Sequence, residues 1–492
     1  MPLQSVMMLA LVLLGLQAAA EIPRTWAAAE VADFEIPLAA PAYSPQHVPE
    51  DYYYRLPARP VYKSYPIYHP DHEPAGYREW LAGQAPEVVF GASEQLQQDD
   101  WVAAGALVFA APIGYNGPVS ARHVSDPAWY AEVGVPITTD GVMPFARWVV
   151  RSAGRPEVGN LACAMCHTRV MPDGTVVDGA QGNFPFDRSI ARDMEPASVQ
   201  SIRAGLRQLT FAPWVLDDPV FSLPRGQLLA TLGSVPGGVV IRHGTSAAYP
   251  ARVPDLIGLR ERRYFDATGL VRHRTIGDLM RYSAANQTID MLASYGGYMP
   301  AGFAERERPP PGGGRFVGTA SRYSDPQLYA LARYLYALEP PPNPHGLDER
   351  ARAGRDVFER HGCARCHAPP LYTNNRLLPV AGFQPPGEHR ARYRIMDISL
   401  DTDPGLTLHT RRGTGYYKVP SLKGLWYRGP LEHSGSVATL EDWFDAARLR
   451  DDYRPTGFAG LAGGPRAVPG HRFGLTLSEP EKNALIAFLK TL

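Results

Sequence analysis

The sequence predicts a mainly α-helical, loop-rich fold in which two similar units follow an irregular N-terminal arm. One cysteine-containing pattern occurs twice and uses all 4 cysteines, which indicates two tandem units. Leucines recur at helical spacing over 325–338 and again over 479–492, near the end of each unit. The chain also contains 47 glycines and 48 prolines among its 492 residues, so a large part of it must be loop.

Each unit should contain one helix before its cysteine pattern and one closing helix after it. In the first unit we expect these helices over 144–153 and 325–338. In the second unit we expect them over 348–361 and 479–492, the last beginning with the capping-box residues Ser478 and Glu481.

The boundaries of the units follow from composition. Residues 21–90 are rich in Pro and Tyr and show little periodicity, so we expect an extended arm there. The first unit is expected over 91–339 and the second over 347–492, joined by the proline-rich linker between them.

The charge balance excludes some partners. Lys and Arg together number 49, and Asp and Glu also number 49, so the formal net charge is zero. Without a basic surplus, nucleic acid is not an expected partner. With 45% hydrophobic and 20% charged residues, the chain has the balance of a globular protein with a buried core.

The N-terminus resembles a secretory signal peptide. Residues 1–20 hold an apolar run from Val6 to Leu16 and an Ala-x-Ala pattern before Glu21. The run is shorter than the roughly 20 apolar residues that span a bilayer. We therefore expect export to the periplasm or secretion without stable membrane insertion; an uncleaved N-terminal anchor is the alternative.

The two cysteine patterns predict covalent haem attachment. Cys163, Cys166 and His167 form one C-x-x-C-H motif, and the second is Cys363-Ala-Arg-Cys366-His367. Two thiols at this spacing reach the two vinyl groups of a haem, and the following histidine supplies the iron with its proximal nitrogen. A redox dithiol does not require this histidine, and a zinc site would need a second pair of ligands nearby. The sequence therefore predicts two covalently bound haem c groups and two tandem cytochrome c-type haem domains.

Several further stretches resemble the bacterial di-haem cytochrome c peroxidase superfamily. They are the residues after His367, the segment 418–441 around Lys-Val-Pro-Ser-Leu-Lys-Gly-Leu, and Val253-Pro-Asp-Leu-Ile-Gly with the residues up to Asp266. The resemblance covers about residues 150–492. The length and the run Gly470-His-Arg-Phe-Gly474 are similar to the larger branch that includes di-haem rubber oxygenases.

The resemblance implies roles for particular residues. Phe265 stands where the family has a tryptophan between the haems, and Asp290 is the nearest match to its acid–base residue. Arg428 and His433 are expected to hold haem propionates, for which the guanidinium fork is suited. The implied partner is a small electron-donor protein of the cytochrome c or cupredoxin type. Related peroxidases also hold calcium between their domains.

His471 is the predicted sixth ligand of the second haem. Ordinary di-haem peroxidases use a Met as this ligand shortly after the segment 418–441, but no Met follows Met396 in this chain. Met396 is the next candidate after His471. His389 lies in a charged stretch where exposure is expected, whereas His409 follows a Pro-Gly turn and is harder to dismiss. Glycines near His471 let its backbone approach a flat macrocycle, and the rubber-oxygenase-like branch has two histidines on this haem.

The expected activity is reduction of hydrogen peroxide at the first haem, with electrons delivered through the second. His167 should be the only strong protein ligand of the first iron, with the sixth position vacant or water-bound, because His243 and His273 carry no clear ligand signature. One alternative is oxygen-dependent cleavage of an apolar substrate near Leu279 and Met280. Another is an electron carrier in which both irons are six-coordinate.

Overall fold

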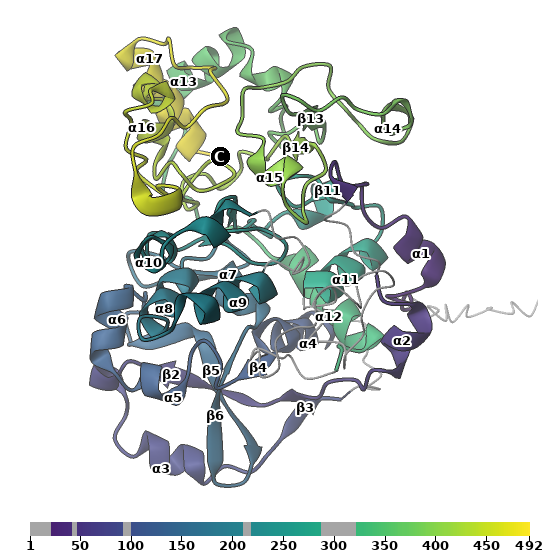
Figure 1. Ribbon diagram of the computed structural model, residues 1–492, viewed down its shortest axis with the longest axis vertical. Helices are drawn as coiled ribbons and strands as arrows, with labels where there is room; N and C mark the ends of the chain where they lie inside the picture. Colours follow the sequence, from purple (N-terminus) through teal and green to yellow (C-terminus); the bar gives the residue numbers. More distant parts are fainter. Residues whose placement is uncertain (1–20, 42–46, 92–99, 210–217, 287–320) are drawn as a thin grey trace, which may run out of the picture.

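The computed structural model describes residues 21–41, 47–91, 100–209, 218–286 and 321–492. Over these ranges the fold is mixed and loop-rich, with 17 α-helices and 14 mostly short strands, so the expectation of a mainly α fold needs correction. The second unit lies above the first in Figure 1, with the N-terminal helices along the side of the first unit. No helix in these ranges is long and apolar enough to cross a membrane, and the predicted signal peptide lies outside them.

A four-stranded antiparallel sheet is the main departure from the predicted fold. Its order is β2 (Ser64–Tyr68), β5 (Val142–Ser152), β6 (Arg155–Asn160) and β4 (Gly114–Tyr115). The helix expected over 144–153 is wrong, because these residues form most of β5. This run is rich in aromatic and β-branched residues and pairs with a strand on each side, so sheet packing overrides the helical interpretation.

The first unit is closed by a helix pair. Helix α4 (Asp100–Ala110) precedes the cysteine motif and packs against α12 (Asp325–Ala337), the helix expected at the unit's end. Gly105 of α4 lies so close to α12 that a Cβ would collide with the Ala330 carbonyl oxygen. The absence of a side chain at Gly105 therefore lets the two backbones approach each other.

The second unit has the same arrangement. Helix α13 (Glu349–Arg360) packs against α17 (Glu479–Lys490), and a Cβ on Gly354 would collide with the Ala484 carbonyl oxygen. Both first helices read Ala-Gly-x-x-Val-Phe, and both closing helices read Ala-Leu-x-x-aromatic-Leu after a capping-box serine. The two units thus contain the same helix pair.

The remaining elements of the first unit are short. Its other helices are α5 (Ala121–Val124), α6 (Pro127–Val133), α7 (Cys163–His167), α8 (Phe186–Asp193), α9 (Val199–Leu209), α10 (Arg225–Gly233) and α11 (Ile276–Ala284). Its strand pairs are β7 (Thr168–Val170) with β8 (Val176–Asp178), β9 (Val239–Val240) with β10 (Ala251–Arg252), and β11 (Tyr264–Phe265) with β12 (Val271–Arg272).

The second unit is built mostly of loops between its two long helices. It contains the strand pair β13 (Leu377–Pro379) and β14 (Tyr416–Lys418), and the helices α14 (Gly387–Arg392), α15 (Gly405–Leu408) and α16 (Leu440–Trp443). Backbone hydrogen bonds join it to the first unit: the Lys418 amide donates to the Ala267 carbonyl, and the Arg252 amide donates to the His433 carbonyl.

The segment 21–90 is more ordered than an extended arm. It contains α1 (Ala28–Ala32), α2 (Glu50–Arg55), α3 (Tyr77–Ala82), β1 (Val61–Tyr62) and β3 (Val88–Phe90), and it supplies the sheet's edge strand β2. Trp26, Phe34 and Tyr53 are buried in the core that also holds the α4–α12 pair. The segment is therefore built into the first unit.

Candidate haem sites

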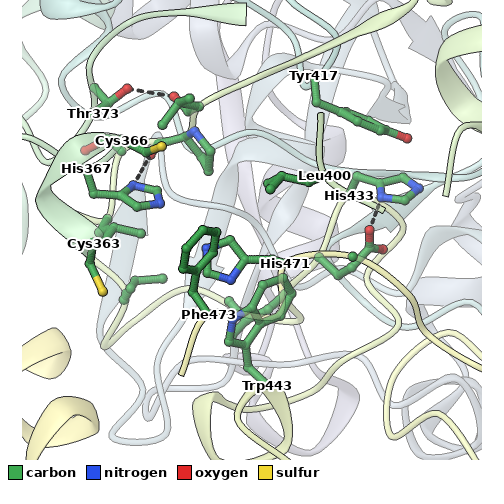
Figure 2. Close-up of a pocket in the computed structure, with 18 of the residues that line it drawn as sticks. Cys363, Cys366, His367, Thr373, Leu400, Tyr417, His433, Trp443, His471 and Phe473 are labelled. Carbon is green, nitrogen blue, oxygen red and sulfur yellow. Dashed lines mark hydrogen bonds and ion pairs between the residues drawn. The ribbon is translucent and has the colours of Figure 1, made fainter. Parts of the chain in front are cut away.

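The second C-x-x-C-H motif opens onto a cavity. Gly362, with a φ of +72°, ends α13 and leads into the turn Cys363–Arg365. Cys363, Cys366 and His367 line a cavity of about 280 Å³, and neither cysteine forms a disulfide. Figure 2 shows these three residues on one side of the cavity and His471 facing them from another loop.

The His367 ring is oriented for metal binding. Its Nδ1 lies 3.2 Å from the carbonyl oxygens of Tyr372 and Pro420. Because a carbonyl only accepts hydrogen bonds, Nδ1 must carry the proton, and Nε2 keeps the lone pair that binds a metal. Burial also lowers the pKa of His367, which favours the neutral ring.

His471 faces His367 at the separation that one shared iron requires. The two ring centroids lie 6.4 Å apart. Two imidazoles on opposite sides of one metal ion, with metal–nitrogen bonds of about 2.0 Å, place their ring centres about 6 Å apart. Within the described ranges, the buried Nδ1 of His471 has no hydrogen-bond partner outside its own residue, and burial with the nearby His367 lowers its pKa to about 4.

A buried arginine holds the loop that carries His471. Arg448 is fully buried and donates hydrogen bonds to the carbonyl oxygens of Val468 at 2.7 Å and of His471 at 2.6 Å. Its Nε donates to the Trp443 carbonyl at 3.0 Å. Sequence reasoning missed Arg448, which has no motif around it.

One region of the cavity lining is rich in basic residues. Arg252, Arg262, Lys418 and Arg428 line it, with Asp255 among them. Burial and the neighbouring arginines lower the pKa of Lys418 to about 7, and burial with Arg428 lowers that of Arg252 to about 9. The carboxylates of Asp255 and Glu432, which also line the cavity, are fewer than these four basic groups, so this region fits an anionic group such as a pair of propionates.

His433 lines the same cavity, as Figure 2 shows, with its ring centroid 4.7 Å from that of Tyr417. Its Nδ1 lies against the Glu432 carboxylate, and burial lowers its pKa to about 4, so the ring is neutral near pH 7. The donor set, the unpartnered His471 nitrogen and the basic region of the lining together fit a covalently held haem.

The first motif repeats the orientation of the proximal histidine. His167 ends α7, and its Nδ1 lies 3.0 Å from the Pro254 carbonyl oxygen, so Nε2 is again left as the metal-binding nitrogen. Burial lowers its pKa to about 4. Both acceptor prolines belong to a repeated sequence, Val-Pro-x-Leu-x-Gly-Leu, at 253–259 and 419–425. This repeat is the sequence signal that predicts the shared orientation.

His243 lies close to His167. It is buried, and the positive charges of Arg412, Arg242 and His167 add to burial in lowering its pKa. Nearby, the buried ion pair of Asp187 and Arg242 leaves the Asp187 Oδ2 and two Arg242 nitrogens without hydrogen-bond partners in the described part of the chain. Orphaned polar atoms beside a C-x-x-C-H motif fit a polar group that belongs there.

The other histidine candidates have different surroundings. His273 uses both ring nitrogens, at the Arg262 carbonyl and the Tyr336 hydroxyl, which indicates a structural role. His389 is buried and hydrogen-bonded to the Tyr416 hydroxyl, so its expected exposure is wrong. His409 packs against Tyr249, outside the lining of the cavity.

Two further sequence predictions can be placed, and a third cannot. Phe265 is buried in the core of the first unit against His273 and Tyr282, and it does not line the cavity of the second unit. Asp290 lies outside the described residues. Met396 accepts a hydrogen bond from the Asn374 side chain and is not in the cavity lining.

The calcium expectation finds no support from clustered acidic side chains in the described ranges. No group of three or more His, Cys, Asp or Glu residues there could hold a metal ion.

Comparison with known proteins gives little further information. No family model matches the chain, and no curated protein matches it. Among solved structures, it is similar to hydrazine synthase of Kuenenia stuttgartiensis pressurised with 20 bar xenon, with 18% identity and a TM-score of 0.28. The match covers 60% of this chain and 87% of the other. At this similarity, function has to be inferred from the residues of the sites themselves.

Proposed function

We propose that this chain is an exported oxidoreductase with two covalently bound haems. The observation that carries the proposal is the pair His367 and His471, which face each other beside Cys363 and Cys366 at a cavity that basic residues also line. The repeated proximal hydrogen bond at His167 supports a second haem at the first motif. A haem bound at each site supplies one-electron redox chemistry.

The second site is proposed as the entry point for electrons. A haem iron held here would have its two positions outside the macrocycle taken by His367 and His471, so this site would exclude an oxidant from direct contact. A small donor protein of the cytochrome c or cupredoxin type would deliver the electrons in the periplasm.

The first site is proposed to reduce hydrogen peroxide. Two electrons and two protons convert one peroxide to two waters, so the site must supply protons as well as electrons. The resemblance gives this task to Asp290. His243 is a second candidate because it is buried and near His167, and a neutral imidazole can hold or transfer a proton.

The buried position of His243 near His167 also supports a second candidate function, electron transfer without catalysis. If the His243 ring binds the first iron permanently, both irons are six-coordinate and the protein is an electron carrier without catalysis. Nothing in the packing favours the oxygen-dependent cleavage considered from the sequence, since Leu279 and Met280 are buried in the core with the α4–α12 pair.

The test begins with the exported protein produced in a host that attaches haem c. Intact mass should equal the processed chain plus two haems, with no free thiol by alkylation. One haem or none would contradict the proposal.

Ferric spectra and ligand binding then separate the two functions. Peroxide turnover with a reduced donor, together with cyanide or carbon monoxide binding at one haem, supports the peroxidase. Two low-spin haems that bind neither ligand, and no turnover, support the carrier.

A further inference from the structure

The second unit inserts an arginine beside the first haem site. Arg412 lies in the loop between α15 and β14, and its side chain is buried among first-unit residues. Its Nε donates to the His243 carbonyl, and one terminal nitrogen donates to the Asn286 side-chain oxygen at 2.5 Å. The other lies 3.4 Å from the Tyr282 hydroxyl and also pairs with Asp266. The guanidinium of Arg412 therefore makes most of its hydrogen bonds to residues of the first unit.

The contact to His243 falls on an unusual stretch of backbone. His243 has a φ of +56° and Gly244 a φ of +87°, so two consecutive residues are left-handed. For a histidine this conformation costs free energy and persists only where its surroundings hold it. Gly244 is also confined, since a Cβ there would clash with the Arg411 side chain. The carbonyl that Arg412 holds belongs to the residue whose ring lies near His167.

The internal repeat shows why the arginine comes from the other unit. Aligning 253–259 with 419–425 places Asp266 opposite Glu432, and these residues share a φ of +70° and +69°. In the second unit Glu432 pairs with the next residue, His433. In the first unit that next position is Ala267, which cannot pair with a carboxylate. Arg412 supplies the missing partner of this carboxylate and donates to the His243 carbonyl at the same time.

We propose that Arg412 is a positioning residue, supplied by the second unit, that fixes His243 at the first haem site. The proposal rests on the proposed function, since it requires a haem at Cys163 and Cys166. It extends that function by making the geometry of the first site depend on a residue of the second unit.

The experiment compares Arg412→Lys with the wild type in the haem-loaded protein. Lysine keeps a charge for Asp266 but cannot also donate from an Nε to the His243 carbonyl. One lost hydrogen bond corresponds to a change of up to about tenfold in the cyanide affinity of the first haem. The spin state of the first haem should shift with it, whereas the signal of the second haem and the haem content should stay unchanged.

Two further variants show whether Arg412 acts through His243. In the His243→Gly background, Arg412→Lys should have no additional effect on the first haem, because coupled residues are not additive. In Arg412→Gly, added guanidinium should restore part of the wild-type spectrum. Arg392→Lys is the matched control, since this exposed arginine contacts Asp33 and does not contact His243.

The outcomes separate the two proposals. A wild type without haem at the first motif contradicts the proposed function. A wild type with two haems whose first haem is unchanged in Arg412→Lys contradicts the role of Arg412 alone. Effects of Arg412→Lys that persist fully in the His243→Gly background also contradict it.

Discussion

Individual histidines at the two sites owe their chemistry to their hydrogen-bond partners. His167 and His367 each donate a hydrogen bond from Nδ1 to a proline carbonyl, which fixes the tautomer before any metal binds. His471 lacks such a partner, so its orientation depends on the loop that Arg448 holds. At the second site, the His367 ring is therefore oriented by hydrogen bonds to its own Nδ1. The His471 ring is positioned instead by the hydrogen bond that Arg448 donates to its backbone carbonyl.

Replacing His471 by Gly should convert one ferric haem from low spin to high spin, because one of the two facing imidazoles is removed. Electron paramagnetic resonance of the purified variant checks this. His409→Gly is the matched control, since His409 packs against Tyr249 and not at the cavity. An unchanged low-spin signal in His471→Gly would assign the ligand elsewhere.

Lys418 should make the haem-free chain less stable at neutral pH. Burial and its arginine neighbours lower its pKa from 10.5 to about 7 in the folded chain, so the unfolded chain binds more protons between these values. The destabilisation is complete at pH 7 and below and disappears as the pH rises toward 10.5; each pKa unit corresponds to about 1.4 kcal/mol.

Lys418→Met, made in a Cys363→Ser/Cys366→Ser chain that cannot attach the second haem, should therefore raise the melting temperature at pH 7. The gain should shrink at pH 10. In the haem-loaded protein propionates would offset the lysine charge, so the gain should be smaller there. An equal gain at both pH values in the haem-free chain would show that the charge of Lys418 is not the cause.

At the scale of elements, close helix crossings define each unit. An Ala normally stabilises a helix by about 1 kcal/mol relative to Gly. At Gly105 and Gly354 the added Cβ would collide with a backbone carbonyl of the partner helix, so Gly→Ala should instead destabilise each unit by about 1–3 kcal/mol. Chemical denaturation measures both changes.

Gly226→Ala provides the control for this prediction. Gly226 lies in α10, and a Cβ there meets nothing within 4 Å. This substitution should be neutral or slightly stabilising. If Gly105→Ala and Gly354→Ala behave like Gly226→Ala, the close approach of the helices is not required for stability.

The helices were predictable to different degrees. Leucine spacing and serine capping boxes predict α12 and α17, since these signals are local in sequence. The strand β5 was mistaken for a helix because its apolar run has no clear period, and only the neighbouring strands decide its state. Helix α4 was overlooked, although its Ala-Gly-x-x-Val-Phe run repeats that of α13.

The residues of the candidate sites were also predictable to different degrees, depending on whether their signal is local in sequence. C-x-x-C-H is a contiguous motif, so its residues could be named from sequence. The facing His471 was also predictable from its glycines and by elimination among the histidines. Arg448 and Arg412 act through backbone carbonyls distant in sequence, and only the folded chain brings those contacts together.

At the scale of the whole molecule, one unit is an elaborated copy of the other. The second unit passes directly from α13 to its cysteine motif. In the first unit β4, α5, α6, β5 and β6 stand between α4 and the motif, and the sheet gains its edge strand β2 from the N-terminal segment. The repeated helix pair and the repeated Val-Pro-x-Leu-x-Gly-Leu sequence are unchanged by this insertion.

The N-terminal segment also links the two units through Asp33. This carboxylate pairs with Arg272 and Arg274 of the first unit and with Arg392 of the second. Asp33→Ala leaves three arginines close together without their shared anion, so we expect a loss of about 1–2 kcal/mol of unfolding free energy, larger at low salt than at high salt. Denaturation at both salt concentrations measures it. Asp51→Ala is the control, because Asp51 pairs with the exposed Arg55 and its loss should change stability little. Equal losses in the two variants would mean that bridging the units contributes nothing beyond an ordinary surface ion pair.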